Sequence, residues 1–369
     1  MKQDNTIVNF MFYKNNRDSL KSICQEQIRR LYYNDKKDLA MRRFEYEYEM
    51  LMKIPGGEKA FLETAEYLKK IQNVCTCVHG YEPVITFRGA VMSSFIAYLI
   101  GIIRDDPLKT DLEPWVFYER KRVIEFNVDI TIRTYKVIKN YEIIPPDSVV
   151  LRIGRDSSII EIVEESIAYK MNASINGDVI SSFFNKVAHE DRQKLRFFTG
   201  YDERYVPYVF STLEKLREYR QLPKDLSELS LLDGFLHSTL KDKDYLHALD
   251  MAYKSGDGNI YDFMISSVED VYHKLLDSGC DKTTAKRIAV ITMSRKKRLG
   301  YEDMLNTVYN LGENYMEMLI NIEHLFSKCQ CYQNSIQEEK LMYLICNHLD
   351  AVSEAYEEVC SFLSDCFKQ

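Results

Sequence analysis

The spacing of apolar residues changes twice along this chain, and that change constrains the fold more than any other feature. From Arg17 to Gln72 the apolar residues recur at helical spacing, between Val84 and Val163 they alternate with polar residues, and after about Leu226 the helical spacing returns. A period of two is typical of strands, whereas a period near 3.6 is typical of helices. The sequence therefore predicts an α/β protein, mostly helical, with a small mixed sheet between helical segments.

Turn signals separate the expected elements. Asn34-Asp35 and Pro55-Gly56-Gly57 divide the first helical segment into three, and Gly154-Arg155-Asp156 divides two strands. An apolar helix is expected at residues 93–103, packed under the sheet. The expected strands are residues 83–86, 122–132, 148–153 and 158–163.

The composition is that of a globular chain. With 369 residues and 46% hydrophobic content, it is long enough to bury a sizeable core in one to three domains. No run approaches the ~18 consecutive apolar residues of a membrane span, and the first residues lack an apolar signal segment. The nine cysteines are odd in number and follow no regular framework, which favours a reducing compartment. We expect a cytoplasmic protein with no membrane partner.

Two short cysteine–histidine groups raise the question of a metal site. They are Cys75-Thr76-Cys77 with His79, and Cys329-Gln330-Cys331 with His324. Neither has the two-residue gap of common zinc knuckles, so free thiols are favoured over metal ligands.

The charge is unevenly distributed. The formal net charge of −7 argues against indiscriminate binding of nucleic acid. Residues 281–300 nevertheless carry seven basic side chains and one acidic side chain. Such a patch can contact the phosphates of DNA or RNA, although a solvated helix end explains it equally well. The residues expected to contact nucleic acid are Arg287, Arg295, Lys296, Lys297 and Arg298.

Four short motifs follow one another between Thr86 and Asp129. Arg88-Gly89 stands in the turn after a strand, Ser93-Ser94 begins the apolar helix, Asp106-Pro107-Leu108 comes next, and Asn127-Val128-Asp129 lies on the longest expected strand. This order resembles that of the C-family bacterial replicative DNA polymerases, the α-subunit type and especially its Gram-positive PolC-type form. Members of that family carry a Ser-Arg-Gly-Ser turn, a serine pair, an Asp-Pro-Leu segment and an Asp-x-Asp strand.

The resemblance implies a division of the chain and a set of roles. Residues 1–225 would form a palm-like region with N-terminal helices, and residues 226–369 an all-helical fingers-like region. In the family, the turn approaches the triphosphate of the incoming nucleotide, and three carboxylates hold two Mg²⁺ ions. The implied nucleotide-binding residues are Arg88, Gly89, Ser93 and Ser94, and the implied carboxylate positions are Asn127, Asp129 and Asn185.

The chain departs from the family pattern at the positions that carry the chemistry. Asn127 and Asn185 offer a carbonyl oxygen but no charge, so Asp129 is the one carboxylate left to hold a metal, and weakly. Phe87, Ala90 and Met92 replace small or polar residues of the turn and are expected to block close backbone approach. Glu125 lies on the order of 13 Å along the strand from Asp129, too far for both to hold one ion. The other acids that could replace the lost ligands are Glu190 and Asp191.

Three hypotheses follow. The first is a pseudo-enzyme that binds nucleic acid, or a replication or other protein partner, without polymerising and without a cofactor. The alternative is a minimal active DNA-directed nucleotidyltransferase that uses Mg²⁺ with relocated carboxylates. The third is a purely structural interaction protein. Arg88 contacts a phosphate in the first two hypotheses, and a structural salt bridge is an equal alternative for it.

Overall fold

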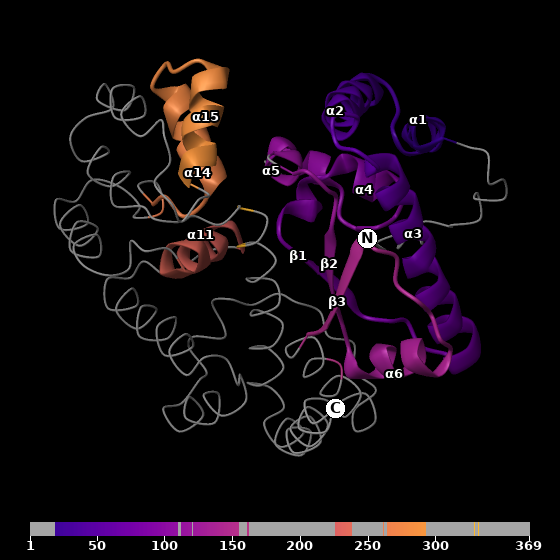
Figure 1. Ribbon diagram of the computed structural model, residues 1–369. Helices are drawn as coiled ribbons and strands as arrows, with labels where there is room; N and C mark the ends of the chain where they lie inside the picture. The colour runs from indigo at the N-terminus through magenta and orange to yellow at the C-terminus, as the bar shows by residue number, and fades with distance from the viewer. Residues whose placement is uncertain are drawn as a thin grey trace, which may run out of the picture. The chain divides into compact units, whose positions relative to one another are not determined.

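The computed structural model comprises two compact units, Met1–Ser158 and Ile159–Gln369 (Figure 1). Its described part is mostly helical and contains a three-stranded mixed sheet, which confirms the predicted α/β class. The division at residues 225 and 226 stays a prediction, because residues 162–225 lie outside the described part. The described residues are 19–109, 112–119, 121–154, 161, 226–237, 261, 264–292, 328 and 331.

Three helices open the first unit, as the helical spacing predicts. They are α1 (Leu20–Leu31), α2 (Asp35–Leu51) and α3 (Gly57–Asn73). The side chain of Ser19 caps α1 by accepting a hydrogen bond from the Ser22 N–H. Gly56, with φ of 70°, holds a left-handed conformation that favours glycine and turns the chain into α3.

The sheet has the order β1-β2-β3, with β1 (Ile85–Arg88) antiparallel to β2 (Phe126–Ile130) and β3 (Val149–Ile153) parallel to it. The parallel pair is joined through α6 (Ile132–Asn140), because parallel strands need a crossover. Phe126, Val128 and Ile130 are fully buried, so the central strand supplies the middle of the core.

Aromatic rings join α3 to the sheet. Phe61 of α3 meets Phe126 of β2 edge to face, with ring centroids 5.1 Å apart, and Phe117 lies 6.1 Å from Phe61. Such pairs stabilise a core by about 1 kcal/mol beyond the area they bury. Thr64 of α3 and Ser148, just before β3, place their hydroxyl oxygens 2.9 Å apart. In Figure 1, α3 accordingly runs along one side of the sheet.

Several predicted boundaries are wrong. β1 continues through Phe87 and Arg88, which were predicted to lie in a turn. β2 stops at Ile130, because Thr131 instead caps α6 by accepting a hydrogen bond from the Thr134 N–H. Glu161, the described residue of the predicted strand 158–163, is helical.

The apolar helix predicted at residues 93–103 is much shorter than expected. A 3₁₀ turn, η2 (Ala90–Ser93), comes first, and α4 (Phe95–Leu99) ends before Gly101, which has φ of 76°. Short elements complete the unit: the π-helix η1 (Val74–Val78), the 3₁₀ turn η3 (Pro107–Lys109) and α5 (Trp115–Tyr118).

The described part of the second unit contains the helices α11 (Leu226–His237), α14 (Val268–Asp277) and α15 (Lys282–Thr292). A capping box of Ser267 and Asp270 begins α14, and Asp281 accepts hydrogen bonds from the first N–H groups of α15. These helices agree with the helical spacing after Leu226, while their fingers-like identity stays a prediction. None of the helices in the described ranges is long and apolar enough to cross a bilayer.

Candidate functional site

Asp129 lies at the centre of the sheet and is 5% exposed. The register of β1 and β2 places it opposite Thr86, and places Asn127 opposite Arg88. The Arg88 Nε–H donates to Asp129 Oδ2, and the two side chains form an ion pair in which Arg88 is half exposed and Asp129 is buried. A guanidinium therefore lies against the acid that was predicted to hold metal.

The second carboxylate oxygen of Asp129 is also informative. Oδ1 is buried and has no hydrogen-bond partner. A buried acceptor without a donor costs about 1–3 kcal/mol relative to its state in water. Arg88 thus balances the charge of Asp129 at Oδ2, whereas Oδ1 has no hydrogen-bond donor.

Among the described residues, the donors around Asp129 do not fit a divalent cation. Asn127, two residues earlier on β2, is a neutral amide, and Glu125 is exposed and precedes the strand. No group of three or more His, Cys, Asp or Glu side chains that could hold a metal ion occurs in the part of the chain that the structure describes. Mg²⁺ binds chiefly through anionic oxygens, and here one carboxylate is already paired with Arg88. Asn185, Glu190 and Asp191 lie outside the described residues.

The turn after β1 differs from the sequence prediction. Phe87 is 7% exposed and packs in the core, so it does not block the turn, and that part of the prediction is wrong. Alternation along β1 explains this, because Phe87 and Arg88 point to opposite faces of the strand. Gly89 has φ of 80°, a conformation that favours glycine, and Ala90 and Met92 pack partly buried against the core.

The serine pair lies inside the fold. Ser93 and Ser94 are both 0% exposed. Ser94 Oγ accepts a hydrogen bond from the Ala97 N–H and so caps α4, and it lies 2.8 Å from the Tyr118 hydroxyl oxygen. The Ser93 hydroxyl donates to the carbonyl of Ala90 at 2.7 Å. Both hydroxyls therefore have structural partners, and their predicted contact with a nucleotide stays a prediction.

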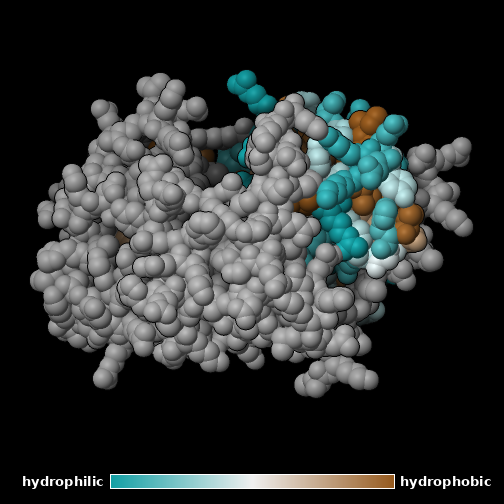
Figure 2. All heavy atoms as spheres, turned by 90° about the horizontal axis from the view of Figure 1, so that it is seen from below, coloured by the Kyte–Doolittle hydropathy of each residue, from teal (hydrophilic) through white to brown (hydrophobic). Residues whose placement is uncertain are grey.

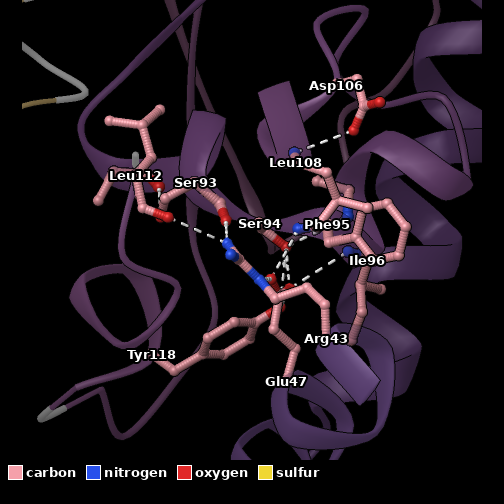
Figure 3. Close-up of polar contacts among 12 residues, drawn as sticks. Arg43, Glu47, Ser93, Ser94, Phe95, Ile96, Asp106, Leu108, Leu112 and Tyr118 are labelled. Carbon is pink, nitrogen blue, oxygen red and sulfur yellow. Dashed lines mark hydrogen bonds and ion pairs between the residues drawn. The ribbon is translucent and has the colours of Figure 1, made fainter. Parts of the chain in front are cut away.

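A buried glutamate of α2 organises this region (Figure 3). Glu47 is 0% exposed, and its Oε1 accepts from Arg43 Nε at 2.6 Å and from the Phe95 N–H at 2.9 Å. Its Oε2 accepts from the Tyr118 hydroxyl at 3.0 Å, the Ile96 N–H at 3.2 Å and the Ser94 hydroxyl at 3.3 Å. The guanidinium of Arg43 also donates to the carbonyls of Ser93 and Leu112. Glu47 and Arg43 thus connect α2, α4 and α5.

The Glu47 carboxylate lies at the N-terminus of α4, where the N–H groups that have no partner within the helix favour an anion. Burial, and then the charge of Glu47, raises the pKa of Tyr118 well above its ordinary value, which keeps the phenol protonated as a donor. Sequence reasoning missed Glu47. One signal was present, because the buried α2 residues Ala40, Phe44 and Leu51 recur at helical spacing and Glu47 falls on the same face.

The basic segment of the second unit is described in part. Arg287 is exposed on α15, one residue after the partly buried Lys286. Arg295, Lys296, Lys297 and Arg298 lie outside the described residues. Contact between this segment and nucleic acid therefore stays a prediction.

Comparison with known families gives one match, to the first unit. Residues 18–142, about a third of the chain, match the family model of the bacterial DNA polymerase III alpha NTPase domain. A search of curated proteins gave no match. The matched segment contains Glu47, Arg88 and Asp129, whereas the PolC type and the resemblance after residue 142 stay predictions. The match supports the predicted family for that segment: residues 18–142 are similar to the NTPase domain of bacterial DNA polymerase III alpha.

Proposed function

We propose that this chain is a catalytically degenerate relative of the DNA polymerase III alpha subunit, of the PolC type, that binds nucleic acid without extending a primer. The observation that carries the proposal is the ion pair between Arg88 and Asp129. The Arg88 guanidinium supplies a fixed positive charge at the acid that would otherwise attract a metal ion. Asn127 adds no negative charge beside it.

The chemistry of phosphoryl transfer explains why this pair matters. Polymerases of this family stabilise charge on the transferring phosphate with metal ions held by several carboxylates. A dication at Asp129 would have to displace Arg88 and would gain one anionic ligand in exchange. Because Asn127, the neighbouring described donor on β2, is neutral, we expect metal binding too weak to support either primer extension or hydrolysis of a nucleoside triphosphate.

The retained function is expected to be contact with a phosphate backbone. Arg287 and the basic residues 295–298 provide several positive charges within a short segment of an otherwise acidic chain. Binding dominated by phosphate contacts weakens steeply as salt rises. A replication protein that holds the same nucleic acid is the expected partner of such a chain.

Metal titration tests the catalytic half of the proposal. Calorimetry with Mg²⁺ and Mn²⁺ is expected to give no saturable binding to the wild-type protein, and Asp129→Ala is the matched control. Saturable binding that disappears in Asp129→Ala would favour the alternative, a minimal active nucleotidyltransferase.

Salt-dependent DNA binding tests the other half. Fluorescence anisotropy with a labelled duplex is expected to show affinity at about 50 mM salt that is largely lost at about 200 mM. The double variant Lys296→Glu/Lys297→Glu should bind more weakly than the wild type. The control Lys36→Glu/Lys37→Glu changes the charge equally at two exposed positions of α2 and should bind as the wild type does. Equal affinities for all three proteins would show that the basic segment is only a solvated surface. No binding at low salt would leave a structural interaction protein as the better description.

A further inference from the structure

A line of rings and cations crosses the surface of the first unit beside α6. The Arg133 guanidinium carbon lies 3.7 Å from the ring centroid of Tyr81. The ring of His79 lies 6.5 Å from that of Tyr81 and 5.5 Å from that of Tyr141, which it meets edge to face. Arg133, Tyr81, His79 and Tyr141 therefore form a continuous series from the first turn of α6 to its C-cap. We call this series, together with Lys136 and Lys139 of the same helix, the α6 platform. The Lys139 Nζ lies 5.2 Å from the ring centroid of Tyr135, also on α6.

The backbone around the platform holds the rings in place. His79 and Tyr81 follow the π-helix η1, which packs against α6. π-helical turns are rare and frequently occur at functional sites. The Cys75 thiol donates to the Tyr81 hydroxyl at 3.2 Å and so helps to hold the Tyr81 ring in place. Preorganised rings lose little conformational entropy when a flat ligand stacks on them.

The platform is open to solvent and carries apolar area. Tyr141 is 45% exposed, and the flanking Val78 and Ile144 are 59% and 83% exposed. In Figure 2, which views the molecule from the side on which Figure 1 draws α6, hydrophobic and hydrophilic residues lie interspersed over the described face. Exposed apolar area beside polar residues is available for contact with a ligand.

The charge of the platform points to an anionic ligand. Arg133, Lys136 and Lys139 are exposed, and α6 contains no acidic residue. Glu142 and Asp147 follow in the next loop, so the positive charge is confined to the helix. The three cations span about 9 Å along the helix axis at 1.5 Å per residue, enough to accompany a short stretch of backbone.

We propose that the α6 platform binds single-stranded nucleic acid, with bases stacked on Tyr141 and His79 and phosphates held by Lys136 and Lys139. Exposed rings beside cations suit unstacked bases, since every base offers a flat face whereas a duplex hides it. A protein partner suits the surface less well, because lysine is depleted from the cores of protein interfaces. This inference rests on the proposed nucleic-acid function but uses a different unit and different residues from the basic segment 282–298.

The test measures binding of a fluorescent oligothymidylate to the full chain. Tyr141→Ala is expected to weaken binding about tenfold or more, as loss of a stacking platform does, while Tyr141→Phe keeps the ring and binds as the wild type. Tyr46→Ala is the matched control, because Tyr46 is 44% exposed on α2 and lies outside the platform. Lys136→Gln/Lys139→Gln should reduce the salt dependence by about 1.4 in the logarithmic slope. Thermal melting of each variant checks that the fold is retained.

The outcomes separate this inference from the proposed function. If Tyr141→Ala and Tyr141→Phe both bind the oligonucleotide as the wild type does, the platform is not a nucleic-acid site and is left to a protein partner. If Lys296→Glu/Lys297→Glu loses duplex binding while the Tyr141 variants lose single-strand binding, both proposals stand. If the wild type binds the duplex but not the oligothymidylate, the proposal for the α6 platform is wrong and the proposed function is unaffected. If Tyr141→Ala loses single-strand binding while Lys296→Glu/Lys297→Glu keeps duplex binding, the proposed contact of the basic segment with DNA is wrong and the proposal for the α6 platform stands.

Discussion

Glu47 and Asp129 are both buried acids of the first unit, yet their surroundings differ sharply. Both oxygens of Glu47 accept hydrogen bonds, from a cation, two hydroxyls and two backbone N–H groups. Asp129 has Arg88 on Oδ2 and no hydrogen bond on Oδ1. Both lie in the segment that matches the polymerase family, but only Glu47 is fully built into the architecture.

This difference separates architecture from chemistry. A buried carboxylate with a complete set of donors fixes the positions of the elements that supply them. A buried carboxylate with an unpaired oxygen can still accept another ligand. At Asp129 the positive charge of Arg88 opposes a cationic ligand. Burial alone therefore does not mark a site; the partners of each oxygen decide what the acid does.

Removing the Glu47 carboxylate should have the largest effect on stability. Glu47→Ala removes the carboxylate that pairs with the largely buried Arg43 and leaves the Arg43 Nε–H and two helix N–H groups of α4 without their acceptor, and we expect a loss of about 3–5 kcal/mol. Urea unfolding followed by the fluorescence of Trp115, the single tryptophan of the chain, measures it in the first unit. The exposed neighbour Glu45 is the control, and Glu45→Ala should change stability little. Similar small losses in both variants would contradict the architectural role of Glu47.

Glu269 of α14 extends the comparison to the second unit. It is 0% exposed, accepts from the Lys328 N–H at 2.7 Å on Oε2, and has no hydrogen bond on Oε1. Burial raises its pKa from 4.5 to about 8. The folded state therefore keeps a proton that the unfolded state releases. This contribution to stability is fully present below pH 4.5 and is lost as pH rises through about 8.

Glu269→Gln should flatten that pH dependence. The amide oxygen can still accept from the Lys328 N–H, and the variant has no charge to bury. We expect it to be more stable than the wild type by a few kcal/mol above pH 8 and similar to it near pH 4.5. Thermal melting by far-UV circular dichroism at both pH values measures the effect, with Trp115 fluorescence reporting the first unit separately. Parallel pH profiles in the two proteins would show that Glu269 does not titrate in this range.

Breaking the Arg88–Asp129 pair should have the smallest effect on stability. Arg88→Ala leaves the buried Asp129 without its cation, but Arg88 is half exposed and solvent screens the pair, so we expect a loss of about 1 kcal/mol. The fully surface pair of Arg104 and Glu82 provides the control, and Arg104→Ala should lose less. Equal losses measured by urea unfolding would mean that Asp129 does not depend on Arg88.

Sequence reasoning located the elements better than the site. The three opening helices and the central strand followed from apolar spacing, which is a local property. The end of β1 did not, because alternation does not show where a strand stops, and Phe87 was wrongly placed in the turn. The environment of Glu47 was missed because most of its donors lie far along the chain, from Ser94 to Tyr118. The Arg88–Asp129 contact depends on the register of β1 and β2, which the motifs alone do not specify.

Primer extension with Mg²⁺ or Mn²⁺ is the most direct measurement of whether the Arg88–Asp129 site is inactive. The purified wild-type protein should give no extended product above the level of Asp129→Ala, because one neutralised carboxylate cannot hold the metal ions that the reaction requires. The double variant Asn127→Asp/Asn185→Asp should also remain inactive, since the Arg88 guanidinium would still be paired with the Asp129 carboxylate. Extension by the wild type that disappears in Asp129→Ala would contradict this conclusion and identify an active nucleotidyltransferase.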